Sequence, residues 1–189
     1  MPYLMEFYVD GACRGNGRPG SIGAAAACLM TRGTAYQYTT RDLPLVRDRV
    51  VCTNQRAEIT AILLALEWAL ERYNELDTDP YLIVKIHSDS RYAIGCMSKW
   101  IHKWRQNGWV NAKGYGVANR DLIEKAADLE DSLTDLGDVD YIWVPREKNH
   151  LPDELCNEAL DKRCNDDEDD DMQDESSDSS DSSDSDYYF

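Results

Sequence analysis

Two apolar runs in this sequence each end in an aspartate, and a long helical segment lies between them. The run EFYVD ends at Asp10, and the run YLIVKIHSD ends at Asp89. Between them, residues 53–74 carry Ile, Leu and Ala at helical spacing. A helix that connects two strands favours a parallel crossover, and neighbouring parallel strands end at the same edge of a sheet. We therefore expect Asp10 and Asp89 to project from one edge of a sheet.

The remaining sequence predicts an α/β domain. Residues 3–9, 21–30 and 34–43 have strand-like patterns, and residues 31–33 make a hairpin-length link between the last two. Glycine-rich residues 11–20 predict a loop. Helices are expected at 90–107, at 119–133 and from about Pro152, with a fifth strand at 139–144. This order predicts one mixed sheet with helices on its faces.

The acidic charge is concentrated near the C-terminus. The chain has a net charge of −16, but residues 165–189 hold 12 of its 36 acidic residues and no Lys or Arg, which leaves 24 acidic against 20 basic residues elsewhere. This Ser/Asp-rich segment has too few apolar residues to offset the entropy of ordering, so we expect a disordered tail after a domain of residues 1–164. The tail either keeps the protein soluble or, through its charge or phosphorylation, regulates a basic binding face.

Cysteine usage and the first residues indicate an intracellular protein. The six cysteines show no CxxC pair and no metal-ligand spacing. The N-terminus lacks the basic start and the cleavage site of a signal peptide. No apolar run approaches the length needed to span a membrane. We therefore expect reduced thiols, a nuclear or cytoplasmic location, no membrane contact and a monomer.

Four carboxylates are candidates for a chemical role, namely Asp10, Glu58, Asp89 and Asp153. Each also has a purely local interpretation. An aspartate after a strand can be a turn residue, Glu58 can favour the start of its helix, and Asp153 beside Pro152 can occupy a first helical turn. Only the convergence of all four side chains distinguishes a chemical role from these local ones.

Several ordered blocks resemble the type 1 ribonuclease H family across residues 3–163. The blocks are DGACRGNGRPGSIG, TNQRAEITAILLALEWAL, HSDSRY and WIHKWRQNGW followed by VANRDL. They are most similar to fungal members. The resemblance implies a ribonuclease H-like fold with a five-stranded mixed sheet. It also implies an endonuclease that hydrolyses the RNA strand of RNA–DNA hybrids and leaves 5′-phosphate and 3′-hydroxyl ends. By resemblance, Asp10, Glu58, Asp89 and Asp153 bind two Mg²⁺ ions, with Mn²⁺ as an alternative ion.

The resemblance further implies a set of substrate contacts. Small and polar residues of the first loop and the helix start would face the minor groove, and glycines would allow its close approach. Trp100 is expected to pack on DNA sugars, whereas Trp104 is expected in the core. Thr53 or Asn54 can also cap the helix of residues 53–74. The expected contacts are Cys13, Asn16, Asn54, Gln55, Trp100 and Lys103, with Lys99, Arg105 and Lys113 as further phosphate contacts.

One loop departs from the pattern of many relatives, which carry a His upstream of the last acid. The loop VPREKNHLPDEL is short, and its His150 lies only three residues before Asp153. Either Glu147 or His150 substitutes for that His, or the enzyme turns over slowly. The competing hypothesis is a hybrid-binding module of the same fold with weakened catalysis. The presence of all four acids favours the enzyme.

Overall fold

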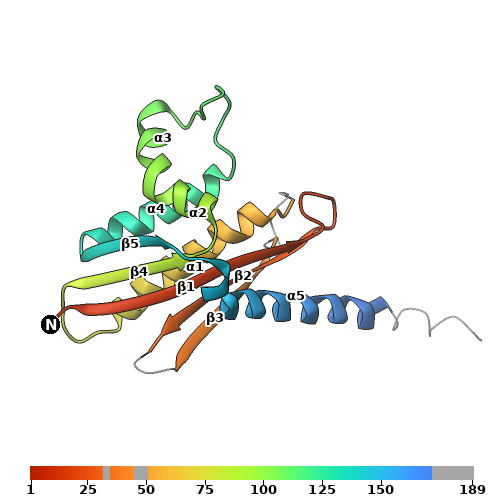
Figure 1. Cartoon of the computed structure of the whole chain (residues 1–189), viewed down its shortest axis with the longest axis horizontal. Helices are drawn as coiled ribbons and strands as arrows, with labels where there is room; N and C mark the ends of the chain where they lie inside the picture. Colours follow the sequence, from red (N-terminus) through yellow and green to blue (C-terminus); the bar gives the residue numbers. More distant parts are fainter. Residues whose placement is uncertain (32–34, 45–50, 172–189) are drawn as a thin grey trace, which may run out of the picture.

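A single mixed sheet organises the molecule (Figure 1). The structure, a computed structural model, describes residues 1–31, 35–44 and 51–171. Its strands pair in the order β3-β2-β1-β4-β5. Their bounds are β1 (Tyr3–Arg14), β2 (Ile22–Met30), β3 (Tyr36–Leu43), β4 (Leu82–Ser88) and β5 (Gly137–Trp143). The predicted α/β class with a five-stranded mixed sheet is confirmed, while most of the expected link at 31–33 lies outside the described residues.

Helices cover both faces of the sheet. Helices α1 (Asn54–Asn74) and α4 (Arg120–Thr134) lie on one face, and α5 (His150–Asp171) crosses the other (Figure 1). The main core lies under α1, whereas a smaller core of Ala24, Ala26, Cys28, Cys156 and Leu160 lies under α5. Strand β2 is therefore buried on both faces, which explains its run of small residues.

The central pair of strands has the predicted parallel arrangement. β1 and β4 pair from Tyr3↔Leu82 to Tyr8↔His87, and Asp10 and Asp89 follow two residues later in the same register. The expected end of β1 at residue 9 is wrong. β1 continues to Arg14 because its second half still pairs with β2, which leaves a shorter loop than residues 11–20. β1 therefore extends beyond the end of its parallel neighbour β4, and Asp10 lies in this extended part.

A helical arm projects beyond the sheet at the top of Figure 1. It begins with α2 (Arg91–Gly95), passes through the π-helical turn η1 (Cys96–Trp100) and ends in α3 (Ile101–Asn107). We call residues 100–116 the handle. Ring contacts of 5.8 Å and 6.3 Å between centroids link Trp100 to Trp104 and Trp104 to Trp109. Trp104 packs against the main core, as predicted.

The last helix runs further than the sequence pattern predicts. α5 continues to Asp171, so residues 165–171 are helical although a disordered tail was expected from residue 165. Packing of the helix start on the sheet supplies a nucleus, and extension then adds one backbone hydrogen bond for each residue. Residues 172–189 lie outside the described part, and the boundary at residue 164 stays a prediction. No helix among the described residues is long and apolar enough to cross a bilayer.

Candidate active site

All four predicted acids line one pocket of about 280 Å³. Asp10 comes from β1, Glu58 from the second turn of α1, Asp89 from the residue after β4, and Asp153 from the first turn of α5. The segments are far apart in the chain and meet where β4 ends and β1 continues. The residues that line the pocket are Asp10, Gly11, Ala12, Cys13, Asn54, Glu58, Asp89, Ser90, Arg146, Asp153 and Asn157.

The backbone around Asp89 is fixed from two sides. The buried Asn149 amide donates to the Val9 carbonyl oxygen at 3.0 Å and to Asp89 Oδ1 at 3.2 Å. The Trp143 indole Nε1–H donates to the Asp89 carbonyl oxygen at 3.0 Å. One amide therefore connects the ends of the two parallel strands and orients the second aspartate.

Burial and mutual repulsion act most strongly on Asp10. Its side chain is 8% exposed. Burial first, then the nearby carboxylates of Asp89, Asp153 and Glu58, raises its pKa to about 7, although the Gly11 N–H opposes the shift. The pKa of Glu58 is also raised, mainly by burial, and the Ser90 hydroxyl opposes this shift by donating to Glu58 Oε2 at 2.5 Å. The site therefore concentrates negative charge at a cost to the fold.

The donor chemistry of the pocket fits a hard divalent cation. Carboxylate oxygens are the ligands that Mg²⁺ and Mn²⁺ prefer, and burial together with the neighbouring carboxylates raises the pKa of Asp10, as expected for acids gathered without a bound cation. In the described part of the chain, no three Asp, Glu, His or Cys side chains are arranged to hold an ion as they stand. Their oxygens instead accept hydrogen bonds, Glu58 from Ser90, Asp89 from Asn149 and Asp153 from Arg146.

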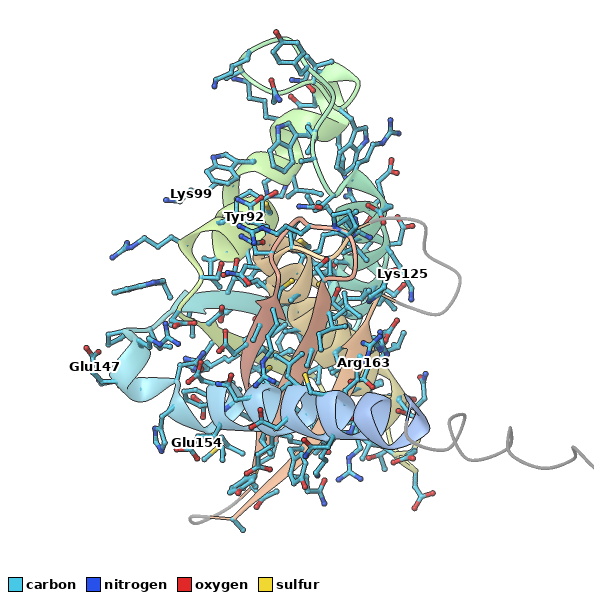
Figure 2. All side chains as sticks on the ribbon, turned by 90° about the vertical axis from the view of Figure 1, so that its right-hand side faces the viewer. Tyr92, Lys99, Lys125, Glu147, Glu154 and Arg163 are labelled. Carbon is cyan, nitrogen blue, oxygen red and sulfur yellow. The ribbon has the colours of Figure 1, made fainter. Side chains whose placement is uncertain are left out.

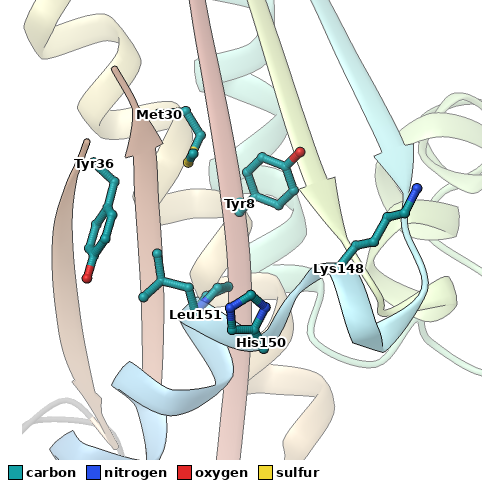
Figure 3. A pocket seen from close by; sticks show the side chains of 7 residues that line it. Tyr8, Met30, Tyr36, Lys148, His150 and Leu151 are labelled. Carbon is teal, nitrogen blue, oxygen red and sulfur yellow. The ribbon is translucent and has the colours of Figure 1, made fainter. Parts of the chain in front are cut away.

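The loop before α5 presents a residue that the sequence reasoning missed. Arg146, in the 3₁₀ turn η2 (Arg146–Lys148), lines the pocket and pairs with Asp153 at 2.8 Å. Neither Glu147 nor His150 lines it. His150 instead faces a separate apolar pocket of about 670 Å³ with Tyr8, Met30 and Leu151 (Figure 3). Arg146 lies seven residues before Asp153 and reaches it from the η2 turn, so sequence distance from Asp153 did not identify the side chain that contacts the acids.

The expected substrate residues fall into two groups. Around the pocket, Cys13 and Asn54 line the wall and Gln55 is exposed. Asn16 Oδ1 accepts from the Asn54 backbone N–H at 3.0 Å, which ties the loop to the start of α1. The N-cap itself is Thr53, whose hydroxyl accepts from the Arg56 N–H.

The second group lies on and beside the handle. Trp100 is 42% exposed and Lys103 is exposed, as contacts to a substrate require. Lys99 projects from the turn that leads into the handle (Figure 2). Arg105 makes two hydrogen bonds to Asp131, at 2.8 Å and 3.1 Å, so a phosphate contact at this residue would compete with an exposed ion pair.

Comparisons with known proteins find relatives along most of the chain. The family model described as RNase H matches residues 3–166. Ribonuclease H of Parvibaculum lavamentivorans is 36% identical over 147 residues, which cover 78% of this chain and 83% of that protein. Ribonuclease H of Legionella pneumophila is 32% identical over 151 residues, or 80% and 90% of the two chains.

Solved structures show the same fold. The crystal structure of RNase H1 from the halophilic archaeon Halobacterium salinarum matches with a TM-score of 0.55 and 25% identity, covering 85% of this chain and 99% of that one. The relatives named here are bacterial and archaeal, so the expected similarity to fungal members stays a prediction. A family match over most of the chain, the shared fold and the four converging acids lead to one conclusion: the chain belongs to the ribonuclease H family of hydrolases.

Proposed function

We propose that the protein is an endonuclease that hydrolyses the RNA strand of RNA–DNA hybrids by two-metal-ion catalysis and leaves 5′-phosphate and 3′-hydroxyl ends. The observation that carries this proposal is the burial of Asp10 among three other carboxylates at the end of the parallel strand pair. Membership of the ribonuclease H family supplies the reaction class.

Each acid has a distinct setting in the proposed site. Asp10, Glu58, Asp89 and Asp153 would hold two Mg²⁺ ions, which when bound supply an activated water and stabilise the departing 3′ oxygen. Ser90 holds the Glu58 carboxylate and Asn149 orients that of Asp89. Arg146 brings positive charge to Asp153 at the pocket wall. These hydrogen bonds hold the carboxylates of Glu58, Asp89 and Asp153 in place before substrate binds. Less conformational entropy is therefore lost when the complex forms.

Recognition of a hybrid requires contact with both strands. We propose that Cys13, Asn16, Asn54 and Gln55 approach the 2′-hydroxyl side of the RNA strand, because they surround the pocket. Trp100 and Lys103 on the handle would contact the DNA strand. The monomeric state, the intracellular location and the function of the acidic tail are predictions that belong to the same proposal.

Cleavage of a labelled hybrid in Mg²⁺ tests the proposal directly. We expect endonucleolytic RNA fragments with 5′-phosphate ends from the hybrid, and none from duplex DNA of the same sequence. The matched variant Asp89→Asn keeps shape and loses charge, and it should cleave on the order of a thousand-fold more slowly. Tight hybrid binding without cleavage by the parent protein would instead favour the binding-module hypothesis.

Substitutions in the loop before α5 separate three candidate accessory residues. We expect Arg146→Gln to lower kcat roughly ten-fold or more, because it leaves the Asp153 carboxylate without its ion-pair partner inside an acidic pocket. Glu147→Gln and His150→Ala should each stay within about two-fold of the parent, since neither side chain lines the pocket. Steady-state cleavage rates at saturating hybrid decide the matter, and a large loss from His150→Ala with none from Arg146→Gln would reverse the assignment.

A further inference from the structure

An arginine and a tryptophan stack beside the acid pocket. Arg91 is the first residue of α2, and its guanidinium carbon lies 3.9 Å from the ring centroid of Trp143. Trp143 is the last residue of β5 and is 40% exposed. Its indole N–H is engaged by the Asp89 carbonyl oxygen at 3.0 Å, which fixes the ring relative to a candidate metal ligand. The guanidinium is therefore held at a defined place next to the site.

The polar edge of this guanidinium is unused. Arg91 is exposed and makes no hydrogen bond or ion pair with any residue that the structure describes. Other exposed arginines in the described segments, such as Arg105 and Arg120, pair with a carboxylate of α4. A guanidinium that stacks on a ring keeps all five N–H donors at its edges, where they match the oxygens of a phosphate.

We propose that Arg91 binds a phosphate of the RNA strand next to the scissile one, and that Trp143 is its positioning residue. The inference rests on the proposed function, because the acid pocket defines where the scissile phosphate lies. Arg91 is connected to Asp89 both along the chain and through the Trp143 indole, so the nearest anion in a bound hybrid belongs to the strand that the acids cleave. Stacking removes side-chain freedom before binding, which makes each hydrogen bond to phosphate less costly in entropy.

Equilibrium binding tests the inference without relying on cleavage. Affinity for an RNA–DNA hybrid is measured in EDTA by fluorescence anisotropy across a series of salt concentrations. We expect Arg91→Gln to weaken binding about ten-fold and to reduce the salt slope by roughly 0.7–0.9, the value for one lost phosphate contact. Arg91→Lys should recover part of the affinity, because it keeps the charge but not the planar fork. The affinity of Trp143→Leu for the hybrid should lie between that of the parent and that of Arg91→Gln. Thermal melting confirms that each variant is folded.

The matched control is Arg72→Gln, which removes the same charge from the last turn of α1. Arg72→Gln should leave the affinity for the hybrid and its salt slope nearly unchanged, apart from the small effect of removing one positive charge from the whole protein. Equal losses from Arg72→Gln and Arg91→Gln, or no loss from the latter, would overturn the inference.

Neutral phosphate analogues identify the contacted strand. Single methylphosphonate linkages placed along each strand remove one charge at a time. The parent protein should bind less tightly when the neutral linkage occupies one RNA-strand position adjacent to the cleavage site. The affinity of Arg91→Gln should not change with a neutral linkage at that position, whereas it should respond as the parent does at all other positions. Sensitivity confined to the DNA strand contradicts the assignment. A parent protein that binds in this pattern but does not cleave would reject the proposed function and leave the Arg91 contact intact.

Discussion

Replacing Asp10 with Asn will stop hybrid cleavage and, in the same protein, stabilise the metal-free fold. Loss of a carboxylate that would help to hold the proposed Mg²⁺ ions should slow cleavage on the order of a thousand-fold or more. The stabilisation has a separate cause. Asp10 is almost fully buried beside three acids, so in the absence of metal its negative charge opposes folding.

The size of the gain follows from the pKa of Asp10. The pKa is about 7 in the folded protein and about 3.9 in an unfolded chain. Ionising this carboxyl above pH 7 therefore costs the fold about 4 kcal/mol. We expect Asp10→Asn to recover roughly 2–4 kcal/mol in EDTA at pH 8. For a domain of this size the melting temperature rises by about 2–4 °C per kcal/mol.

The pH dependence has a definite sign. A carboxyl whose pKa is raised by folding binds its proton more tightly in the folded state, so its contribution is fully present below about pH 4 and is lost as pH rises through about 7. The stability difference between Asp10→Asn and the parent should therefore be largest at pH 8 and smaller by roughly 2–3 kcal/mol at pH 5. Other acids change stability with pH in the opposite direction, such as Asp121, whose pKa is lowered by Arg56. Their contribution to the free energy of unfolding is the same in both proteins, so it cancels in the difference.

Two controls complete this experiment. Asp77→Asn makes the same chemical change at an exposed loop position and should leave stability within about 0.5 kcal/mol. Mg²⁺ should raise the melting temperature of the parent and have little effect on Asp10→Asn, because only a folded site with its ligands gains from binding. If Asp10→Asn is no more stable than the parent in EDTA at pH 8, the burial of the Asp10 carboxylate beside three other acids does not oppose folding as the structure indicates.

The sequence pattern alone predicted that two of the four acids converge, whereas Glu58 and Asp153 were assigned to the site by the resemblance to the ribonuclease H family. A helix between two strand-like runs favours a parallel crossover, and the parallel pairing of β1 with β4 brings Asp10 and Asp89 to one edge. In the structure, Glu58 reaches the same pocket because α1 packs directly against β1. The core position of Trp104 followed from the size of its ring.

What could not be predicted depends on the packing of one element against another. The second half of β1 contains glycine and small residues and resembles a loop, yet it remains a strand because β2 pairs with it. Arg146 and Asn149 lie in a loop whose local sequence has no periodicity. Their roles come from the path of that loop over the strand ends, where one side chain is buried and the other meets Asp153.

Gly11 illustrates the same limit and gives the second large effect. The resemblance to the ribonuclease H family implies that glycines of this segment allow the hybrid to come close. In the structure, a Cβ at Gly11 would lie 2.1 Å from the carbonyl carbon of Ala57, 2.3 Å from its oxygen and 2.4 Å from the backbone nitrogen of Glu58. The neighbour that requires glycine here is therefore helix α1, whose backbone contacts β1 directly beside Asp10.

Gly11→Ala should damage both the fold and the site. All three atoms nearest to the new methyl group belong to backbone, so no side chain can rotate away and α1 must move outward. Overpacking of this kind costs about 1–3 kcal/mol, and we expect about 3 kcal/mol because the obstruction is a helix. The same movement carries Glu58 away from Asp10. A displacement of about 1 Å at reacting groups lowers rates on the order of a hundred-fold.

Denaturant unfolding and cleavage kinetics of the same Gly11→Ala preparation measure the two effects separately. Kinetics at a temperature where the variant is fully folded isolate the displaced acid from simple loss of protein. Gly116→Ala is the matched control for stability, because a Cβ there meets no atom within 4 Å, and its free energy of unfolding should equal that of the parent. A Gly11→Ala protein that is as stable as the parent would mean that α1 does not approach β1 this closely. One that is destabilised but cleaves at the parent rate would mean that the position of Glu58 relative to Asp10 does not limit catalysis.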